Sequence, residues 1–295
     1  MELEIREHLI DLPNGARLNY AEAGRGTLMV FVHGFPECWH RWVPQLREFG
    51  RDHRVVAPDT RGINLSFKPE GVEAYHARHL ADDIVKFIEA LSPAPVVLVG
   101  HDWGGVMAWL VAMDAPHLLE KLVVINAPFP AMFARELAEN PAQREASQYM
   151  NALRDPGAEE RILARDFKGL ESGLTGMGPA ADWYTPELRA RYREAWQRPG
   201  ALTAALNYYR ATTMRPPKPG EDWTPRMPRQ ERMRVRVPTL VIWGMQDKGL
   251  LAGCLDGMED YVDDLTVVRM PEGSHWVSAE QPDKVNAAIR RFIGG

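Results

Sequence analysis

The stretch VVLVGHDWGG, residues 96–105, carries an acid in a position suited to a nucleophile. Asp102 stands in a Gly-x-Asp-x-Gly frame between an apolar, β-branched run and a helical pattern, which is the setting of a nucleophile elbow. The glycines permit the tight turn that lifts one side chain above a sheet. Such an elbow normally presents serine, so a carboxylate here predicts attack on an sp³ carbon and a covalent alkyl ester.

Two later residues fit the roles of orienting acid and base, in the chain order nucleophile, acid, histidine. Asp247 follows an apolar run at 239–243, and His275 lies between a run at 265–269 and a closing helical pattern at 284–293. Loops at the carboxyl ends of parallel strands gather at one edge of the sheet. We therefore expect Asp102, Asp247 and His275 to meet, with His275 activating the water that hydrolyses the ester.

The segment FVHGFP, residues 31–36, predicts part of an oxyanion hole. It ends the first apolar run, and the backbone N–H of Phe35 is placed to donate to a developing oxyanion. The N–H of Trp103, directly after the nucleophile, is expected to be the second donor.

The elements that must position these groups alternate between strand and helix. Apolar runs at 28–32, 55–57 and 96–99 read as buried parallel strands, and 77–91 repeats its apolar residues at helical spacing. A strand, a helix and a strand in that order predict a βαβ crossover, and hence an α/β fold with a mostly parallel central sheet covered by helices on both faces.

The alternation is interrupted once, which predicts three segments. From 128 to 224 the strand pattern disappears, and helical runs such as 187–197 and 202–213 are separated by proline and glycine. We interpret 128–224 as a helical cap inserted into an α/β core formed by 1–127 and 225–295.

Composition excludes several classes of function. The chain has 45% hydrophobic and 25% charged residues and a net charge of −5, without the basic face that nucleic acid would require. It shows no secretory leader, no apolar run long enough for a membrane span, and two cysteines without metal-ligand spacing. These features predict a soluble, cytoplasmic protein with no cofactor or metal and no nucleic-acid or membrane partner; they leave its oligomeric state open.

Four motifs together resemble those of the α/β-hydrolase-fold epoxide hydrolases. They are HGFPECW at 33–39, DTRG at 59–62, GHDWGG at 100–105 and GSHW at 273–276, and they occur in order over nearly the whole chain. The resemblance implies the α/β-hydrolase fold, with Asp102 as nucleophile, His275 as base and Asp247 as its partner. It also implies that the peptide before Pro36 is often cis. The Ile63-Asn64 pair departs from the family's pattern, which predicts altered pocket edges.

The resemblance further implies two cap tyrosines whose phenols bind the epoxide oxygen. Tyr149 matches the first position and Tyr209, directly before Arg210, matches the second, with Tyr208 as the competing candidate. Aromatic residues are expected to form the pocket walls and to select a small, apolar epoxide, which reacts with water. These candidate wall residues are Phe35, Trp39, Trp103, Phe129 and Trp183.

Two alternatives to an epoxide hydrolase follow from the same residues. A haloalkane or haloacid dehalogenase would use the same aspartate, and the Trp103 indole suits a halide, but position 35 is Phe where haloalkane dehalogenases can place Asn. Positions 103 and 106 also lack the arginines that hold a haloacid carboxylate. A catalytically silent scaffold is disfavoured because all three candidate triad residues are present.

Overall fold

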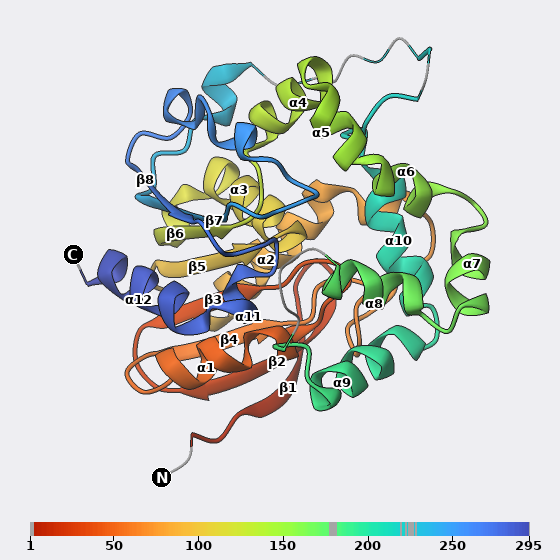
Figure 1. Cartoon of the computed structure of the whole chain (residues 1–295). Helices are drawn as coiled ribbons and strands as arrows, with labels where there is room; N and C mark the ends of the chain where they lie inside the picture. The colour runs from red at the N-terminus through yellow and green to blue at the C-terminus, as the bar shows by residue number, and fades with distance from the viewer. Residues whose placement is uncertain are drawn as a thin grey trace.

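The computed structural model describes residues 3–176, 182–218, 220–221, 223, 227 and 229–294, which fold around one eight-stranded sheet (Figure 1). The strand order is β1-β2-β4-β3-β5-β6-β7-β8. Strand β2 pairs antiparallel with β1 and with β4, and all other pairings are parallel. The strands are β1 (Arg6–Asp11), β2 (Arg17–Gly24), β3 (Leu28–Val32), β4 (Arg54–Pro58), β5 (Val96–His101), β6 (Leu119–Ile125), β7 (Thr239–Gly244) and β8 (Leu265–Met270).

Helices cover both faces of the sheet because its central strands are apolar on both sides. In β3, Val30 and Val32 pack in the same core cluster as apolar residues of α2 (Ala77–Leu91) and α3 (Trp103–Asp114). The alternate residues Met29 and Phe31 pack in a second cluster with α1 (Val43–Phe49) and α12 (Pro282–Ile293). A short helix, α11 (Val277–Glu280), precedes α12. The predicted α/β class with a mostly parallel, two-sided sheet is confirmed.

The sequence analysis did not predict the first two strands. Five of the six residues of β1 are exposed, so this edge strand lacks the apolar alternation that marks a half-buried strand. Together β1 and β2 form a hairpin that extends the sheet beyond β4 with antiparallel strands.

Between β6 and β7 the described residues form helices and no strand. Figure 1 shows α6 to α10 grouped at one end of the sheet. The helices of this segment are α4 (Pro130–Glu139), α5 (Pro141–Ala146), α6 (Gln148–Arg154), α7 (Ala158–Ala164), α8 (Lys168–Thr175), α9 (Pro186–Gln197) and α10 (Ala201–Ala211). The cap limits of 128 and 224 stay a prediction, and residue 224 lies outside the described residues.

Hydrogen bonds join this helical segment to the rest of the chain. The Trp196 indole N–H of α9 donates to the Pro36 carbonyl at 2.6 Å, and the Tyr208 hydroxyl of α10 donates to the Arg61 carbonyl at 2.6 Å. In the opposite direction, the Trp276 indole N–H donates to the Gly173 carbonyl at 3.2 Å. Among the described residues no helix combines the length and apolar character that crossing a membrane requires.

Candidate active site

The turn between β5 and α3 presents Asp102 above the sheet. Asp102 has φ 51° and ψ −122°, a backbone conformation that residues other than glycine rarely adopt. Two glycines of α3 let that helix approach closely. A Cβ on Gly104 would lie 2.1 Å from the Val32 carbonyl oxygen, and one on Gly105 would lie 2.3 Å from the Ala127 Cβ. The GHDWGG motif is therefore required sterically as well as chemically.

The loop after β3 holds one oxygen of the Asp102 carboxylate. The backbone N–H of Phe35 donates to Asp102 Oδ1 at 2.7 Å, and the Phe35–Pro36 peptide is cis, as the resemblance implies. A Cβ on Gly34 would lie 2.4 Å from the Asp102 Cβ, so only glycine allows this approach. Phe35 thus occupies the position expected of an oxyanion-hole donor. Trp103 is the first residue of α3, and the contribution of its N–H stays a prediction.

The structure brings His275 and Asp247 to the same edge of the sheet as Asp102. His275 Nδ1 lies 2.7 Å from Asp247 Oδ2, and its Nε2 lies 3.6 Å from Asp102 Oδ2. Burial alone would lower the pKa of His275, but the carboxylates of Asp247 and Asp102 outweigh burial and raise it to about 10. The two carboxylates therefore favour the charged form of the imidazole in the free protein.

Asp247 is held as a carboxylate by a complete set of donors. Its Oδ1 accepts the N–H groups of Gly249 at 2.8 Å and Leu250 at 2.9 Å. Burial would raise the pKa of Asp247, but the charge of His275 and these hydrogen bonds hold it below its ordinary value. An ionised Asp247 can therefore orient His275 and stabilise its imidazolium form.

Asn126 is a site residue that the sequence analysis missed. It directly follows β6, has φ 41°, and its amide nitrogen donates to Asp247 Oδ2 at 2.8 Å. Its carbonyl oxygen accepts the Gly244 N–H at 2.9 Å, so the amide orientation is fixed. The signal that could have identified Asn126 is its place at the carboxyl end of a predicted parallel strand.

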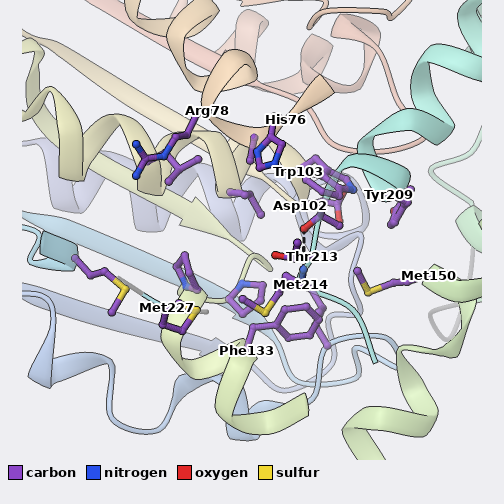
Figure 2. A pocket seen from close by; sticks show the side chains of 18 of the residues that line it. His76, Arg78, Asp102, Trp103, Phe133, Met150, Tyr209, Thr213, Met214 and Met227 are labelled. Carbon is purple, nitrogen blue, oxygen red and sulfur yellow. Dashed lines mark hydrogen bonds between the residues drawn. The ribbon is translucent and has the colours of Figure 1, made fainter. Parts of the chain in front are cut away.

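A cavity of about 260 Å³ opens beside Asp102 (Figure 2). Its wall is mostly apolar and unusually rich in methionine, a flexible side chain that adapts to irregular shapes. The lining residues are His76, Ala77, Arg78, Asp102, Trp103, Val106, Leu110, Met113, Pro128, Pro130, Phe133, Tyr149, Met150, Tyr209, Thr212, Thr213, Met214, Met227, Met233 and Leu250. A volume of this size suits a small organic molecule.

Tyr149 on α6 and Tyr209 on α10 both line the cavity that contains Asp102. Their ring centroids are 6.1 Å apart, and the Tyr209 ring packs edge-on against Trp103 at 5.4 Å. Tyr209 is 3% exposed, whereas Tyr149 is 38% exposed. Desolvation by the surrounding protein, reinforced by the charge of Asp102, raises the pKa of each phenol above its ordinary value. Both phenols are therefore protonated at neutral pH and can donate hydrogen bonds.

Tyr208 faces a different part of the protein. Its hydroxyl contacts Thr60 Oγ1 at 2.9 Å and donates to the Arg61 carbonyl, and it is not among the residues that line the cavity. Of the two neighbouring tyrosines, only Tyr209 is placed to contact a molecule beside Asp102.

Several aromatic residues predicted as pocket walls lie elsewhere. Trp39 is 6% exposed, stacks on His40 with ring centroids 3.7 Å apart, and donates its indole N–H to Glu7. It does not line the cavity beside Asp102, and its contact with a substrate stays a prediction. Phe129 packs against Trp109 in the core, and Trp183 against Trp276. The Phe35 ring contacts Tyr209 but does not line the cavity. Of the five, only Trp103 is a wall residue.

The Ile63-Asn64 loop lies at a separate, very small cavity. Ile63 and Asn64 line a space of about 10 Å³ together with Phe35 and Pro36. The Asn64 amide donates to the buried Asp59 carboxylate at 2.8 Å, so the asparagine at this position satisfies a buried charge. Neither residue borders the cavity beside Asp102, and the predicted change in pocket edges stays a prediction. No cluster of His, Cys, Asp or Glu among the described residues is arranged to hold a metal ion.

Comparison with known proteins gives the same picture over nearly the full length. Residues 27–282 match the family model described as alpha/beta hydrolase fold. The chain is 37% identical to the AB hydrolase superfamily protein YfhM of Bacillus subtilis, with 95% of each chain covered. It is also 37% identical to epoxide hydrolase 4 of Mus musculus, with 95% of this chain and 77% of that protein covered.

Solved structures agree with the sequence relatives. A crystal structure of an epoxide hydrolase from Bacillus megaterium in complex with an inhibitor superposes with a TM-score of 0.87 at 33% identity, covering 98% of this chain and 100% of that one. A structure described among novel epoxide hydrolases from metagenomes of hot environments gives a TM-score of 0.87 at 38% identity, with both chains fully covered.

Proposed function

Because this chain belongs to the α/β-hydrolase fold family, within the group that contains the epoxide hydrolases, we propose that it opens an epoxide to a vicinal diol. One observation carries the proposal. The Asp102 carboxylate lies in a largely apolar cavity whose wall also carries the phenols of Tyr149 and Tyr209. A nucleophile and two hydrogen-bond donors around one small cavity are what the opening of a strained ether requires.

The first step forms a covalent ester. The Phe35 N–H donates a hydrogen bond to Asp102 Oδ1, so Oδ2 is the oxygen that is available to attack an epoxide carbon. A new C–O bond forms to Oδ2 as the ring C–O bond breaks, and its electron pair stays on the former epoxide oxygen. Tyr149 and Tyr209 donate hydrogen bonds to that oxygen, and one of the two phenols passes its proton to it. The oxygen becomes a hydroxyl and the phenol becomes a phenolate, so no alkoxide is left in the apolar cavity.

The second step regenerates the carboxylate. His275 removes a proton from water, and the hydroxide oxygen attacks the Asp102 carbonyl carbon. Negative charge moves to the carbonyl oxygen, which the Phe35 N–H and, on our proposal, the Trp103 N–H stabilise. When the tetrahedral intermediate collapses, the ester C–O bond breaks and the proton held by His275 passes to the departing oxygen. The second hydrogen of the water leaves the Asp102 carboxyl as a proton and restores the phenol that protonated the epoxide oxygen, so the carboxylate and both phenols are regenerated. Asp247, with a lowered pKa, stabilises the intermediate imidazolium.

Serine in the place of Asp102 could not complete this cycle, because alkylation of serine gives an ether that water does not cleave. Halide displacement uses the same aspartate, but a halide does not need the pair of phenols beside Asp102. The phenols therefore favour an epoxide over a haloalkane. Most of the cavity wall is apolar, which favours a small, apolar or aryl-substituted epoxide.

A substrate panel tests this function. The purified protein is incubated with aliphatic and aryl epoxides, styrene oxide among them, and with short haloalkanes and haloacids, and both diol and halide are measured. We expect diol from at least one epoxide class, lost in the Asp102→Ala variant. Faster halide release than diol formation, or no diol across the panel, would overturn the proposal.

A further inference from the structure

The buried side chain of Gln143 joins the helical segment to the loop of the triad acid. Gln143 lies on α5 with none of its surface exposed. Its amide nitrogen donates to Ser147 Oγ and to the Gly249 carbonyl, each at 2.8 Å. Its amide oxygen accepts the Leu251 N–H at 2.8 Å. Both amide N–H groups and the amide oxygen of Gln143 are therefore used. Ser147 is four residues away, whereas Gly249 and Leu251 lie more than a hundred residues away in the sequence.

Each end of this connection leads to a group that the proposed reaction needs. Ser147 is the N-cap residue of α6, two positions before Tyr149. On the other side, the Gly249 N–H donates to Asp247 Oδ1, and the Gln143 amide is bonded to the carbonyl of the same glycine. The Gln143 amide thus connects α6, which carries Tyr149, with the backbone that holds the Asp247 carboxylate.

The far end of α6 is fixed as well. The Arg154 guanidinium donates to the Tyr209 carbonyl and, at 2.6 Å, to the Thr212 carbonyl. These carbonyls belong to the C-terminal end of α10, where helices leave backbone acceptors unpaired. Arg154 therefore joins the helix of Tyr149 to the backbone of Tyr209, whereas Gln143 joins it to the loop of Asp247.

We propose that Gln143 is a positioning residue, which sets the Tyr149 phenol relative to Asp102 and holds the Asp247 loop in register with His275. The proposal rests on the proposed function, because it assigns Gln143 a part in both steps of that reaction. A misplacement of about 1 Å at a reacting group lowers rates by about 10²-fold. Loss of the amide should therefore slow both ester formation and ester hydrolysis.

Single-turnover kinetics with styrene oxide test this proposal. In the Gln143→Met variant, which keeps the side-chain length without the amide, we expect both steps to slow by about tenfold or more. The Ser147→Ala variant removes only the side-chain bond toward α6 and keeps the backbone bond from the Ser147 N–H to the Gln143 carbonyl. Ester formation should therefore slow while ester hydrolysis keeps the wild-type rate. A residue that merely stabilises the fold would not separate the two steps in this way.

The other fully buried glutamine of the described chain provides a matched control. Gln45 donates to the Ser278 carbonyl and to Asn286 Oδ1, away from the cavity. Gln45→Met should lower Tm and leave both single-turnover rates within about twofold of wild type. If Gln143→Met and Ser147→Ala behave like Gln45→Met, the positioning role is wrong.

Two further outcomes are distinguishable. If Gln143→Met does not fold, the Ser147→Ala result decides alone, because that variant removes one hydroxyl. If the wild-type protein forms neither ester nor diol from any epoxide, the proposed function fails, independently of Gln143. Wild-type turnover with unchanged rates in the folded variants overturns only the positioning role.

Discussion

Nε2 of His275 lies 3.6 Å from Oδ2 of Asp102, beyond hydrogen-bond length but within reach of the same small molecule. Nδ1 of His275 lies 2.7 Å from Asp247, so the imidazole is held from one side and faces the nucleophile from the other. In this arrangement His275 is better placed to deprotonate a water that attacks an Asp102 ester than to act on the Asp102 carboxylate itself.

Replacement of the base should trap the ester. In a His275→Gln variant, Asp102 can still attack, but ester hydrolysis should slow by about 10²- to 10⁴-fold, the usual contribution of general base catalysis. Intact-mass spectrometry after incubation with an epoxide should show one adduct of the full epoxide mass, located on Asp102 by peptide mapping. The Asp102→Ala variant should show no adduct. An unmodified His275→Gln protein that still releases diol would contradict this mechanism.

The phenols should affect only the first step. Tyr149→Phe and Tyr209→Phe should each slow ester formation by about 10- to 100-fold, which corresponds to a hydrogen bond to a charged atom of about 1.5–3 kcal/mol. Tyr208→Phe is the matched control, since its hydroxyl contacts Thr60 and Arg61 away from the cavity. It should lower stability and leave ester formation unchanged. Equal effects of all three variants on the first step would refute the assignment of the phenols.

The pKa of His275 should fall when the ester forms. In the free protein the carboxylates of Asp247 and Asp102 raise it to about 10. Esterification removes the charge of Asp102, so the rate of ester hydrolysis should rise with pH around a midpoint below 10. Rapid-quench measurement of ester decay, compared with NMR titration of His275 in the free protein, checks this difference. Coincident midpoints would show that Asp102 does not influence the imidazole.

The same shift predicts a pH dependence of stability. The folded-state pKa of His275, about 10, lies above the ordinary value of 6.5 expected in the unfolded chain. The stabilisation from its ionisation is therefore complete below about pH 6.5 and is lost as the pH rises through about 10. The free energy of unfolding of wild type, relative to His275→Gln, should decline over that window in urea titrations. If the difference in the free energy of unfolding between wild type and His275→Gln grew as the pH rises, the raised pKa of His275 would be contradicted.

The approach of the Phe35 loop to Asp102 should tolerate no side chain at position 34. A Cβ on Gly34 would lie 2.4 Å from the Asp102 Cβ, so Gly34→Ala should lower kcat/KM by about 10²-fold or more through displacement of the nucleophile or the loop. Gly169 on α8 is the control, because a Cβ there would meet nothing within 4 Å. Gly169→Ala should leave kcat/KM unchanged and raise Tm slightly, as expected for alanine inside a helix.

The sequence predicted most of what local patterns determine. The helix at 77–91 has the bounds that its apolar spacing indicates, and the loops of Asp102, Asp247 and His275 converge because parallel strands end at one edge. Both are consequences of periodicity and chain order, which a single sequence carries.

What escaped prediction depends on tertiary packing. Strand β1 is an exposed edge with no apolar alternation, and Asn126 resembles any polar residue at a strand end until Asp247 lies beside it. Tyr208 and Tyr209 are adjacent on α10, where successive side chains point about 100° apart, so only the position of the helix decides which faces the cavity. The contact of the Trp39 indole with Glu7 was not predictable either, because a motif does not encode the direction in which a loop side chain points.

The hydrogen bonds from Trp196 to Pro36 and from Tyr208 to Arg61 have a consequence for substrate access. They hold α9 and α10 to the loops that follow β3 and β4, so these helices can move away from the sheet only if both bonds break. Of the described residues that line the cavity, the exposed ones are His76, Arg78, Tyr149 and Thr213. We therefore expect epoxide to enter and diol to leave between these four side chains, and the width of that opening should limit how bulky a product is released quickly.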